Sequence, residues 1–474
     1  MNIMENTKSG LSDYLEFNKY RTINIMHIGR MAAKHGPFDL LRDLKRYPWI
    51  WDLLKVNSLL QRLVEGRSGN YRTAVAMVLG GVVDGVIELL EGIFYRSDRL
   101  ILHEDLLPSE IFRAMGLQPW VPELLGILLP MIVPDSMQKY LDAAENEGIP
   151  PDICSLPRAT IGMAMKKAFP PALAVVSSNM PCDGGMSAYT VIAKQMNKPA
   201  YWVDIPFDFK SERALDYFAG ELKAMIAWLE ENTPGRMDWD RLKEICEKRN
   251  VMAELELDIW DMIRHRPAPM AAEAIWMSHL WFFNINPGYD ISIKLLTDLK
   301  SLTEKNLAAG VSAVPHEKYR ALLWNPPTLH YVDLMVWAER TYGVSLILDS
   351  MSFNRQPFID TSSPDSILKS LGGIIMQGPM ARHTRGPAEM NYFPDIFHMV
   401  KRFDLDMVWV AGHIGCKNTQ AMSGVLREKC RDAWIPLLVI DYDLMDSRIT
   451  PKEGIQEQVS NFMENIMKAR RLDQ

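Results

Sequence analysis

The sequence predicts an α/β protein: two parallel-sheet α/β domains of the Rossmann-like or flavodoxin-like kind, with a helical N-terminal region and a helical linker. Short, continuous apolar runs alternate with helix-like segments in two parts of the chain, as is typical of buried parallel strands. Elsewhere, apolar residues recur at three- and four-residue steps, which indicates helices. We expect a helical N-terminal region at residues 1–95, a first α/β domain at 96–212, a helical linking region at 213–330 and a second α/β domain at 331–474.

The N-terminal region shows helical periodicity in YPWIWDLLKVNSLLQRLVEG. The apolar stretch that follows, TAVAMVLGGVVDGVIELLEGIF, contains Asp84, Glu88 and Glu91. Three carboxylates make a crossing of a bilayer costly. We therefore expect a buried amphipathic helix here, and no contact of the protein with a membrane.

The first α/β domain is expected to begin with the apolar run RLILH, a turn at Pro108 and a helix that ends near Gly116. The strands PALAVVSS and PAYWVDIP follow, separated by the helix-like MSAYTVIAKQMNK. Two long helical patterns then form the linking region, the second closed by Pro267 and Pro269.

The second α/β domain is expected to contain the strands VSLILDS, MVWVAGH and PLLVIDYD. The helices between them are SPDSILKSLGGIIM, FPDIFHMVKRF and NTQAMSGVLREKCRDA, and GIQEQVSNFMENIMKARRL closes the chain. The two halves share a pattern of strand, cysteine-containing loop and helix.

Composition excludes several classes of protein. The 474 residues carry 52 basic and 59 acidic side chains, a net charge of −7, which argues against nucleic-acid binding. The polar start, MNIMENTKSGLSDYLEF, lacks the features of a signal peptide, so we expect a cytoplasmic protein. Five cysteines are too few for a disulfide scaffold, and in a reducing compartment they are free, catalytic or metal-bound.

Three cysteines lie where chemistry is expected. Cys182 and Cys416 each follow a predicted strand and precede a helix, and ligands bind beyond the carboxyl ends of parallel strands. Cys154 also precedes a helix-like segment, 28 residues before Cys182. A helix start favours the thiolate, which is the form that binds metal. Cys246 and Cys430 lie within helix patterns, and we expect both to be structural.

Three thiolates from separate loops suit a [4Fe–4S] cluster with one open iron site. A zinc site would normally show more closely paired ligands, and no compact CxxC run is present. Simple burial of three small apolar side chains is the alternative. Nucleophilic catalysis by Cys416 with His413 is less favoured, because no motif ties the two residues together.

The chain resembles the 2-hydroxyacyl-CoA dehydratase and benzoyl-CoA reductase subunits. GHIGCKNTQAMSGVLREKCRDAWIPLLVIDYDLMDSRITPKEGIQEQVSNFMENI resembles their C-terminal signature, with Cys416, the Ile435-Pro436 strand entry and an Asp-rich turn that ends in Arg448. PDICSLPRATIG and ALAVVSSNMPCDGGMSAYTVIAKQMNKPAYWVDIPFD resemble the first and second cysteine segments.

The segment LLPSEIFRAMGLQPW resembles the family's early P-x-E…A-x-G element. Spacing and length are most similar to the larger subunit of the 2-hydroxyglutaryl-CoA type. One departure precedes this element: the chain has His103, Glu104 and Asp105 where the family often has serines.

The resemblance implies an enzyme, a lyase: an ATP-activated (R)-2-hydroxyacyl-CoA dehydratase that works anaerobically and eliminates water from a 2-hydroxyacyl-CoA thioester through a ketyl radical. It implies a [4Fe–4S] cluster with one open iron site, held by Cys154, Cys182 and Cys416. The implied partners are a homologous second subunit in a heterodimer, an ATP-dependent iron–sulfur activator protein and the acyl-CoA substrate. The chain has no GxxxxGK[ST] loop of its own to bind ATP.

Two other readings of the resemblance stay open. The chain could be a subunit of a benzoyl-CoA reductase-like, ATP-coupled reductase, or a non-catalytic electron-transfer or scaffold subunit of such a complex. Hydrogenation of the substrate, as opposed to redox-neutral loss of water, would distinguish a reductase from a dehydratase.

Further candidates for catalysis are His103, Glu110 and His413. The two histidines lie at strand ends, where they could exchange protons, and a loop histidine with satisfied hydrogen bonds is the alternative. Glu110 could act as a base, although its place after Pro108 favours a role in starting a helix.

Three segments have weaker signals. Arg382, His383 and Arg385 in MARHTRGP could contact CoA phosphates, but a solvated surface loop is favoured. Glu317 and Arg320 are expected to form a structural ion pair. Turn chemistry accounts for the Asp-rich segment that ends in Arg448.

Overall fold

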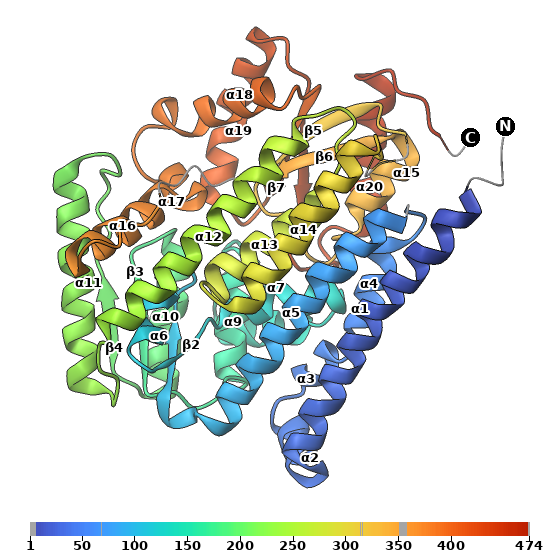
Figure 1. Cartoon of the computed structure of the whole chain (residues 1–474). Coiled ribbons are helices and arrows are strands. Elements are labelled where there is room, and N and C mark those ends of the chain that lie inside the picture. The colour runs from blue at the N-terminus through green and yellow to red at the C-terminus, as the bar shows by residue number, and fades with distance from the viewer. Residues whose placement is uncertain (1–5, 68, 313, 315, 350–357, 473–474) are drawn as a thin grey trace.

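The computed structural model describes residues 6–67, 69–312, 314, 316–349 and 358–472. Two four-stranded sheets, each wrapped by helices, form the body of the molecule, and a layer of long N-terminal helices runs along one side (Figure 1). This is the predicted α/β architecture with a helical N-terminal region.

The N-terminal layer and the first α/β unit contain the helices α1 (Asn6–His35), α2 (Pro37–Arg46), α3 (Trp49–Leu53), α4 (Val56–Val64), α5 (Gly69–Tyr95), α6 (Ser109–Ala114), α7 (Glu123–Ile132), α8 (Gln138–Asn146), α9 (Ser155–Met165) and α10 (Asp183–Met196). The remaining helices are α11 (Glu212–Asn232), α12 (Trp239–Ile263), α13 (Ala272–His279), α14 (Asp290–Ala308), α15 (Leu334–Tyr342), α16 (Pro364–Gln377), α17 (Pro379–Thr384), α18 (Tyr392–Arg402), α19 (Lys417–Asp432) and α20 (Lys452–Asn465). Short helical turns lie at η1 (Ser97–Arg99), η2 (Leu280–Ile285) and η3 (Ala388–Met390).

The two sheets share one topology. The first contains β1 (Leu100–His103), β2 (Gln118–Trp120), β3 (Ala174–Ser178) and β4 (Ala200–Val203), in the order β2-β1-β3-β4. The second contains β5 (Tyr319–Trp324), β6 (Val344–Asp349), β7 (Met407–His413) and β8 (Leu437–Tyr442), in the order β6-β5-β7-β8. All strand pairs are parallel, so the ends of neighbouring strands lie at the same edge of each sheet.

The structure adds two strands that the sequence pattern did not predict. The short β2 lies in a segment without a clear strand pattern, and β5 lies within residues 213–330, which we expected to be helical. The reason for the second error is Arg320, a charged residue within β5 that is nevertheless fully buried. Its charge interrupts the apolar run by which buried strands are recognised.

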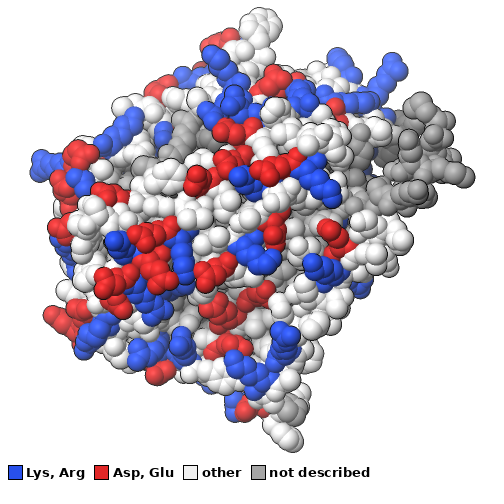
Figure 2. Space-filling view, in the orientation of Figure 1, with Lys and Arg blue, Asp and Glu red and all other residues white. Residues whose placement is uncertain are grey.

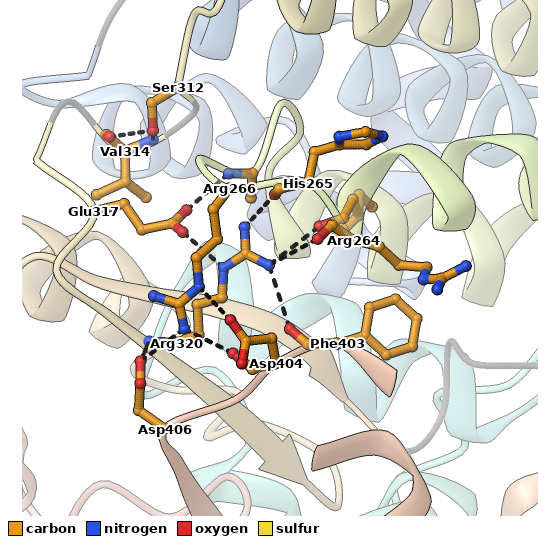
Figure 3. A network of polar contacts seen from close by, with 12 residues as sticks. Arg264, His265, Arg266, Ser312, Val314, Glu317, Arg320, Phe403, Asp404 and Asp406 are labelled. Atoms are coloured by element: carbon orange, nitrogen blue, oxygen red, sulfur yellow. Dashed lines mark hydrogen bonds and ion pairs between the residues drawn. The ribbon is translucent and has the colours of Figure 1, made fainter. Parts of the chain in front are cut away.

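A network of polar groups holds the Arg320 side chain in the interior (Figure 3). Its Nε donates to Glu317 at 2.7 Å, which confirms the predicted ion pair, and its remaining N–H groups donate to backbone carbonyls that include those of His265 and Phe403. Arg266 pairs with Asp404 at 2.9 Å close by. The end of α12 is thereby fixed to the start of β5 and to the loop before β7, because a buried cation needs all these partners.

The long helix α5 lies at the centre of the N-terminal layer. By length and composition it is the one described helix that could cross a membrane, yet 78% of its most apolar window is buried inside the protein. Helix α1 runs along it in the same direction, since Lys34 pairs with Glu91 at 2.8 Å and Arg72 stacks on Phe17. The predicted buried helix is thus present.

A buried arginine ties this layer to the rest of the molecule. Arg67, in the turn after α4, donates through Nε and Nη2 to Glu339 of α15 at 2.9 and 2.8 Å, and through Nη1 to Glu273 of α13. Tyr71 of α5 donates to the same Glu339 carboxylate at 2.8 Å. These side chains are almost completely buried, so loss of one partner would leave an uncompensated charge in the interior and destabilise the fold.

Charges on the outside are mixed in sign. On the face seen in Figure 2, acidic and basic side chains alternate, and neither sign forms a broad continuous patch. That face therefore lacks the basic surface with which nucleic-acid binders neutralise phosphates.

Replacing Arg67 by Met should destabilise the protein by about 3–5 kcal/mol, because it leaves the buried Glu273 and Glu339 carboxylates without their cation. Denaturant unfolding measures the change. Arg340→Met is the matched control: Arg340 pairs with Glu65 at 3.6 Å on the surface, where solvent screens the pair, and we expect little effect. Equal effects of the two substitutions would contradict the structural role assigned to Arg67.

Candidate functional site

The candidate site lies where the carboxyl ends of the two sheets approach each other. In each sheet the strand order reverses direction between two neighbouring strands, β1 and β3 in the first and β5 and β7 in the second. Ligands bind at such switch points in open α/β sheets. Cys182 follows β3 and caps α10, Cys416 follows β7 and caps α19, and Cys154 caps α9.

The loops of Cys154 and Cys416 are in direct contact. A Cβ atom on Gly415 would lie 2.7 Å from the Cα and 3.0 Å from the N of Cys154. Only glycine permits this approach, since the atoms on the other side belong to the backbone and cannot rotate away. At the surface, Lys417 pairs with Asp152 at 3.0 Å and joins the same two loops.

The loop of Cys182 packs against the other side of the Cys154 loop. A Cβ atom on Gly184 would lie 3.3 Å from Pro157 Cγ and 3.7 Å from Ile153 Cγ2. The three thiols are close enough to interact electrostatically: burial raises the pKa of Cys154, and the charges of Cys182 and Cys416 raise it further. The structure therefore brings together the three cysteines that the sequence analysis selected.

His413 orients the sulfur of Cys154. The backbone N–H of Leu444 donates to His413 Nδ1 at 3.1 Å, so the ring proton is on Nε2. Nε2 in turn lies 3.2 Å from Cys154 Sγ and can donate to it. Burial also lowers the pKa of this histidine. His413 thus lies at the site as predicted, and its geometry is that of a hydrogen-bond donor to a sulfur.

Hydroxyl and amide groups orient the other two sulfurs. Thr419, one turn into α19, donates to Cys416 Sγ at 3.2 Å and accepts from Asn325 Nδ2 at 3.0 Å. Cys182 is exposed at the surface, yet the protein packed around its sulfur still raises the pKa of the thiol, and the backbone N–H groups of Gly185 and Gly184 act against that rise. Donors of this kind stabilise thiolates at helix starts.

One cation lies beneath the site. Arg158, in the first turn of α9 after Cys154, is fully buried. It donates to the Pro151 carbonyl and pairs with Glu145 at 3.2 Å, whereas its Nε and Nη2 have no partner among the described residues. A buried guanidinium with free donors is suited to balance negative charge nearby.

A cluster of buried acids borders the site, and sequence reasoning did not identify it. Glu104 accepts from Ser178 at 3.1 Å, and Tyr189 donates to Glu123 at 3.3 Å. Burial raises the pKa of Glu104 and of Asp105, and raises that of Glu123 to about 8. The signal in the sequence was the unusual His103-Glu104-Asp105 run, whereas nothing in the sequence analysis pointed to Glu123.

A cavity of about 70 Å³ opens beside this cluster. Its polar lining includes Asp105, Glu110, Arg249 and His279, and its apolar lining includes Phe283 of the π-helical turn η2. π-Helical turns occur often at functional sites.

The other two catalytic candidates occupy structural positions. His103 is buried, lies 2.8 Å through Nδ1 from the Glu104 carbonyl, and has its pKa lowered by burial to about 4. Glu110 lies in the first turn of α6 and pairs with the buried Arg249. The favoured interpretation of Glu110 as a helix-start residue therefore agrees with the structure.

The segment MARHTRGP is not a solvated loop, which was our favoured alternative. Arg382 and His383 lie in α17 and bond to Asp395 at 3.1 and 2.9 Å. Arg385 donates to the Asn179 carbonyl at 2.8 Å, which fixes α17 to the loop that carries Cys182. Contacts with the neighbouring α18 thus hold this basic segment half-buried.

Two remaining predictions agree with the structure. Cys246 and Cys430 are buried within α12 and α19, apart from the strand ends, and burial raises the pKa of both. The Asp-rich segment is a turn, in which Asp446 accepts from Arg448 at 2.9 and 2.8 Å.

The three cysteine thiols suit a cluster of several metal ions better than a single ion. Among the described residues, no three His, Cys, Asp or Glu side chains lie close enough to hold a single metal ion. Zinc would need sulfurs at about 2.3 Å from one ion. A cluster of several irons spreads its cysteines further apart, and soft thiolates are its ordinary ligands. Three thiols on adjacent loops, with hydrogen-bond donors directed at their sulfurs, fit a cluster of several irons.

Comparison with known proteins gives one match. The model of the family described as 2-hydroxyglutaryl-CoA dehydratase, D-component, matches residues 106–466. This range contains both sheets except β1, and all three cysteine loops. No curated protein matches the chain.

Replacing Gly415 by Ala should separate the loops of Cys154 and Cys416, because the new Cβ would clash with the Cys154 backbone. We expect a destabilisation of about 1–3 kcal/mol on denaturant unfolding, and a lower yield of Cys154–Cys416 cross-link with a short bis-maleimide, which alkylates both thiols. Gly424→Ala in α19, which has open space around it, is the control and should be neutral or slightly stabilising. A wild-type cross-link yield in Gly415→Ala would contradict the contact.

The raised pKa of Glu123, about 8, predicts a pH-dependent stability. Because the folded pKa lies above that of the unfolded chain, ionisation disfavours the folded state, so stability falls as the pH rises above the ordinary carboxyl value of 4.5 and levels off once the pH has passed about 8. The free energy of unfolding of the wild type should fall by more than about 1 kcal/mol relative to Glu123→Gln between about pH 5 and 9. Glu254→Gln, on an exposed face of α12, should follow the wild type. Parallel curves for the wild type and Glu123→Gln would show that Glu123 ionises normally.

Proposed function

The chain belongs to the 2-hydroxyglutaryl-CoA dehydratase D-component family, and from this premise we propose that it is the [4Fe–4S] subunit of an ATP-activated (R)-2-hydroxyacyl-CoA dehydratase. The family places the protein with components of a dehydratase, a lyase. Our proposal goes further in naming the cluster, the activation by ATP and elimination of water from the thioester through a ketyl radical.

One observation supports the proposal: the loops of three cysteines from distant parts of the chain pack against one another. Cys154, Cys182 and Cys416 all lie within the matched range, and Gly415 lets two of their loops touch. Three thiolate ligands would leave one iron of a bound four-iron cluster open for a substrate oxygen.

The proposed reaction needs an electron, because the β hydrogen of a 2-hydroxyacyl thioester is not acidic enough for an ordinary base. When bound, the cluster would supply that electron and a Lewis-acidic iron. The protein's own part is to hold the sulfurs, keep water out and move protons.

Side chains around the cysteines are suited to the first task. His413 Nε2 and Thr419 Oγ1 each lie 3.2 Å from a cysteine sulfur and can donate to it. Arg158 provides a buried positive charge next to Cys154. Together these groups would stabilise the anionic sulfurs, although Cys182 is exposed and Cys154 and Cys416 are half-buried in this subunit.

The buried acids are suited to the third task. A neutral carboxylic acid such as Glu123, whose pKa is about 8, can give a proton to a departing hydroxyl and release it as water. Asp105 lies at the wall of the neighbouring cavity, where an acyl group could reach it. We assign proton transfer to this cluster in preference to His103, whose pKa of about 4 keeps it neutral and which is fully enclosed.

The remaining parts of the proposal concern partners and location. We propose a heterodimer with a homologous second subunit, reduction by a separate ATP-dependent iron–sulfur activator protein, and work in the cytoplasm on an acyl-CoA substrate. The chain's own lack of a GxxxxGK[ST] loop agrees with ATP hydrolysis on another protein.

Replacement of Cys154, Cys182 or Cys416 by Ser, one at a time, should remove bound iron and sulfide, because each sulfur would be a cluster ligand. Iron and sulfide analysis of protein purified without oxygen, together with its visible absorption, measures the loss. Cys246→Ser and Cys430→Ser are the matched controls, since both cysteines are buried within helices, and should keep wild-type iron.

Colourless, iron-free wild-type protein from such a preparation would refute the cluster. Iron-loaded protein that hydrogenates its thioester substrate, instead of releasing water without net reduction, would change the assignment from a dehydratase to a reductase.

A further inference from the structure

The cavity beside the buried acids has an open side and a closed side. Segments from the end of β1, the start of α6, α12, η2, α16 and α17 line it. Asp105, Asn284 and Met380 in this lining are partly exposed, whereas Glu110 and Phe283 are buried. A group of moderate size can therefore enter from solvent and become enclosed.

The cavity is a neighbour of the Cys182 loop. Helix α17 contributes to its wall, and Arg385, just after that helix, donates to the Asn179 carbonyl in the loop at 2.8 Å. On another side, Asp105 interacts electrostatically with Glu123, and Glu123 does so with Cys182. A thioester that reacts beside Cys182 would thus have this cavity within reach of its acyl chain.

The basic side chains of the lining already have carboxylate partners. Arg249 of α12 pairs with Glu110 and donates to the Phe283 carbonyl at 2.9 Å. His279 of α13 lies 2.8 Å through Nδ1 from Glu256. All of these side chains are buried. Among the described residues that line the cavity, no arginine, lysine or histidine is left without a carboxylate.

The acidic side chains of the lining add to this effect. Asp105 shares a side-chain hydrogen bond with Glu104, and Glu110 faces Arg249. A further carboxylate that entered the cavity would lose its hydration without gaining a counter-ion, and it would meet these acids. Both effects disfavour the charged form of a bound group.

The remaining lining favours hydrocarbon. It includes Leu107, Phe283, Leu371 and Ile375, all of them buried. The Phe283 ring stacks on that of His279, with 4.9 Å between the ring centroids, so the aromatic wall is held in place. Transfer of an apolar chain from water to such walls is favourable in proportion to the area that it buries.

We propose that this cavity binds the acyl chain of the thioester and selects chains, aliphatic or aromatic, that have no charged end group. The inference rests on the proposed function, from which it takes the 2-hydroxyacyl-CoA substrate. It sets this chain apart from the activity in the description of its family, because a 2-hydroxyglutaryl group ends in a free carboxylate.

Glu110 is the specificity-determining residue in this proposal. An arginine with free N–H groups would bind a substrate carboxylate well, often through two hydrogen bonds. Glu110 occupies the Arg249 guanidinium instead. The pair therefore leaves the inner end of the cavity without a net positive charge, and a neutral chain fits there better than an anionic one.

Calorimetric titration of the full-length protein, purified without oxygen, tests the substrate class. The two ligands are 2-hydroxyglutaryl-CoA and 2-hydroxy-5-methylhexanoyl-CoA, in which an isopropyl group replaces the terminal carboxylate at similar size. We expect the neutral thioester to bind at least about tenfold more tightly, because desolvation of an unpaired carboxylate is costly. Equal affinities, tighter binding of 2-hydroxyglutaryl-CoA or binding of neither thioester would overturn the proposal.

Glu110→Gln tests the specificity assignment. Glutamine keeps the shape of the side chain but removes its charge, so Arg249 becomes available to a substrate carboxylate. We expect the ratio of the two dissociation constants to shift at least about tenfold toward 2-hydroxyglutaryl-CoA. Glu254→Gln, on an exposed face of α12, is the control and should keep the wild-type ratio. An unchanged ratio in folded Glu110→Gln protein would contradict the role of Glu110.

A second pair of variants tests the apolar wall without a change of charge. Ile375→Ala should weaken binding of the neutral thioester about tenfold, because the chain loses apolar contact. Ile367→Ala, buried in the same helix but outside the lining, is the matched control and should bind it as the wild type does. Equal binding by the two variants would show that the acyl chain lies elsewhere.

The outcomes separate this inference from the proposed function. Iron-free wild-type protein would refute the cluster, whereas the ratio of the dissociation constants depends on the cavity and requires no turnover. Iron-loaded protein that dehydrates and prefers 2-hydroxyglutaryl-CoA would support the proposed function and overturn the selection of neutral chains.

Discussion

The approach of two backbone segments at Gly415 and Cys154 is the constraint on which the site depends. The two sheets are built alike, and each alone presents one cysteine beyond its third strand. Neither could gather three sulfurs by itself. Because position 415 has no Cβ, the second unit can lie directly against the Cys154 loop of the first, and the crevice between the units becomes a single site.

Buried arginines and carboxyl groups occur in two different settings in this protein. Arg67 and Arg320 are surrounded by carboxylates and carbonyls, and they lock helices to sheets. Arg158 and the acids Glu104, Asp105 and Glu123 are less completely paired and lie beside the cysteines. Incomplete pairing costs stability, so it is tolerated mainly where charge or protons are used.

Sequence patterns identified most of the fold because buried parallel strands are continuous apolar runs, and PALAVVSS and MVWVAGH are clear examples. They failed at β5, where Arg320 interrupts the run and the partners of its side chain lie up to 83 residues away. The three cysteines were found because loops at strand ends are local features. Glu123 and Arg158 were missed, since only the folded chain reveals that a helix-start carboxyl and a helix arginine become buried beside a sulfur.

The arrangement of the N-terminal layer has a consequence for biosynthesis. Helix α1 packs on α5, whose residues follow about 57 positions later, and Arg67 finds its carboxylates 206 and 272 positions further along the chain. During translation, the apolar surface of the first helices therefore stays exposed to solvent, and Arg67 stays without its carboxylate partners, until the later segments have been synthesised. At a translation rate of about 5–20 residues per second, such a nascent chain exposes apolar surface for many seconds. Chaperones bind chains in this state.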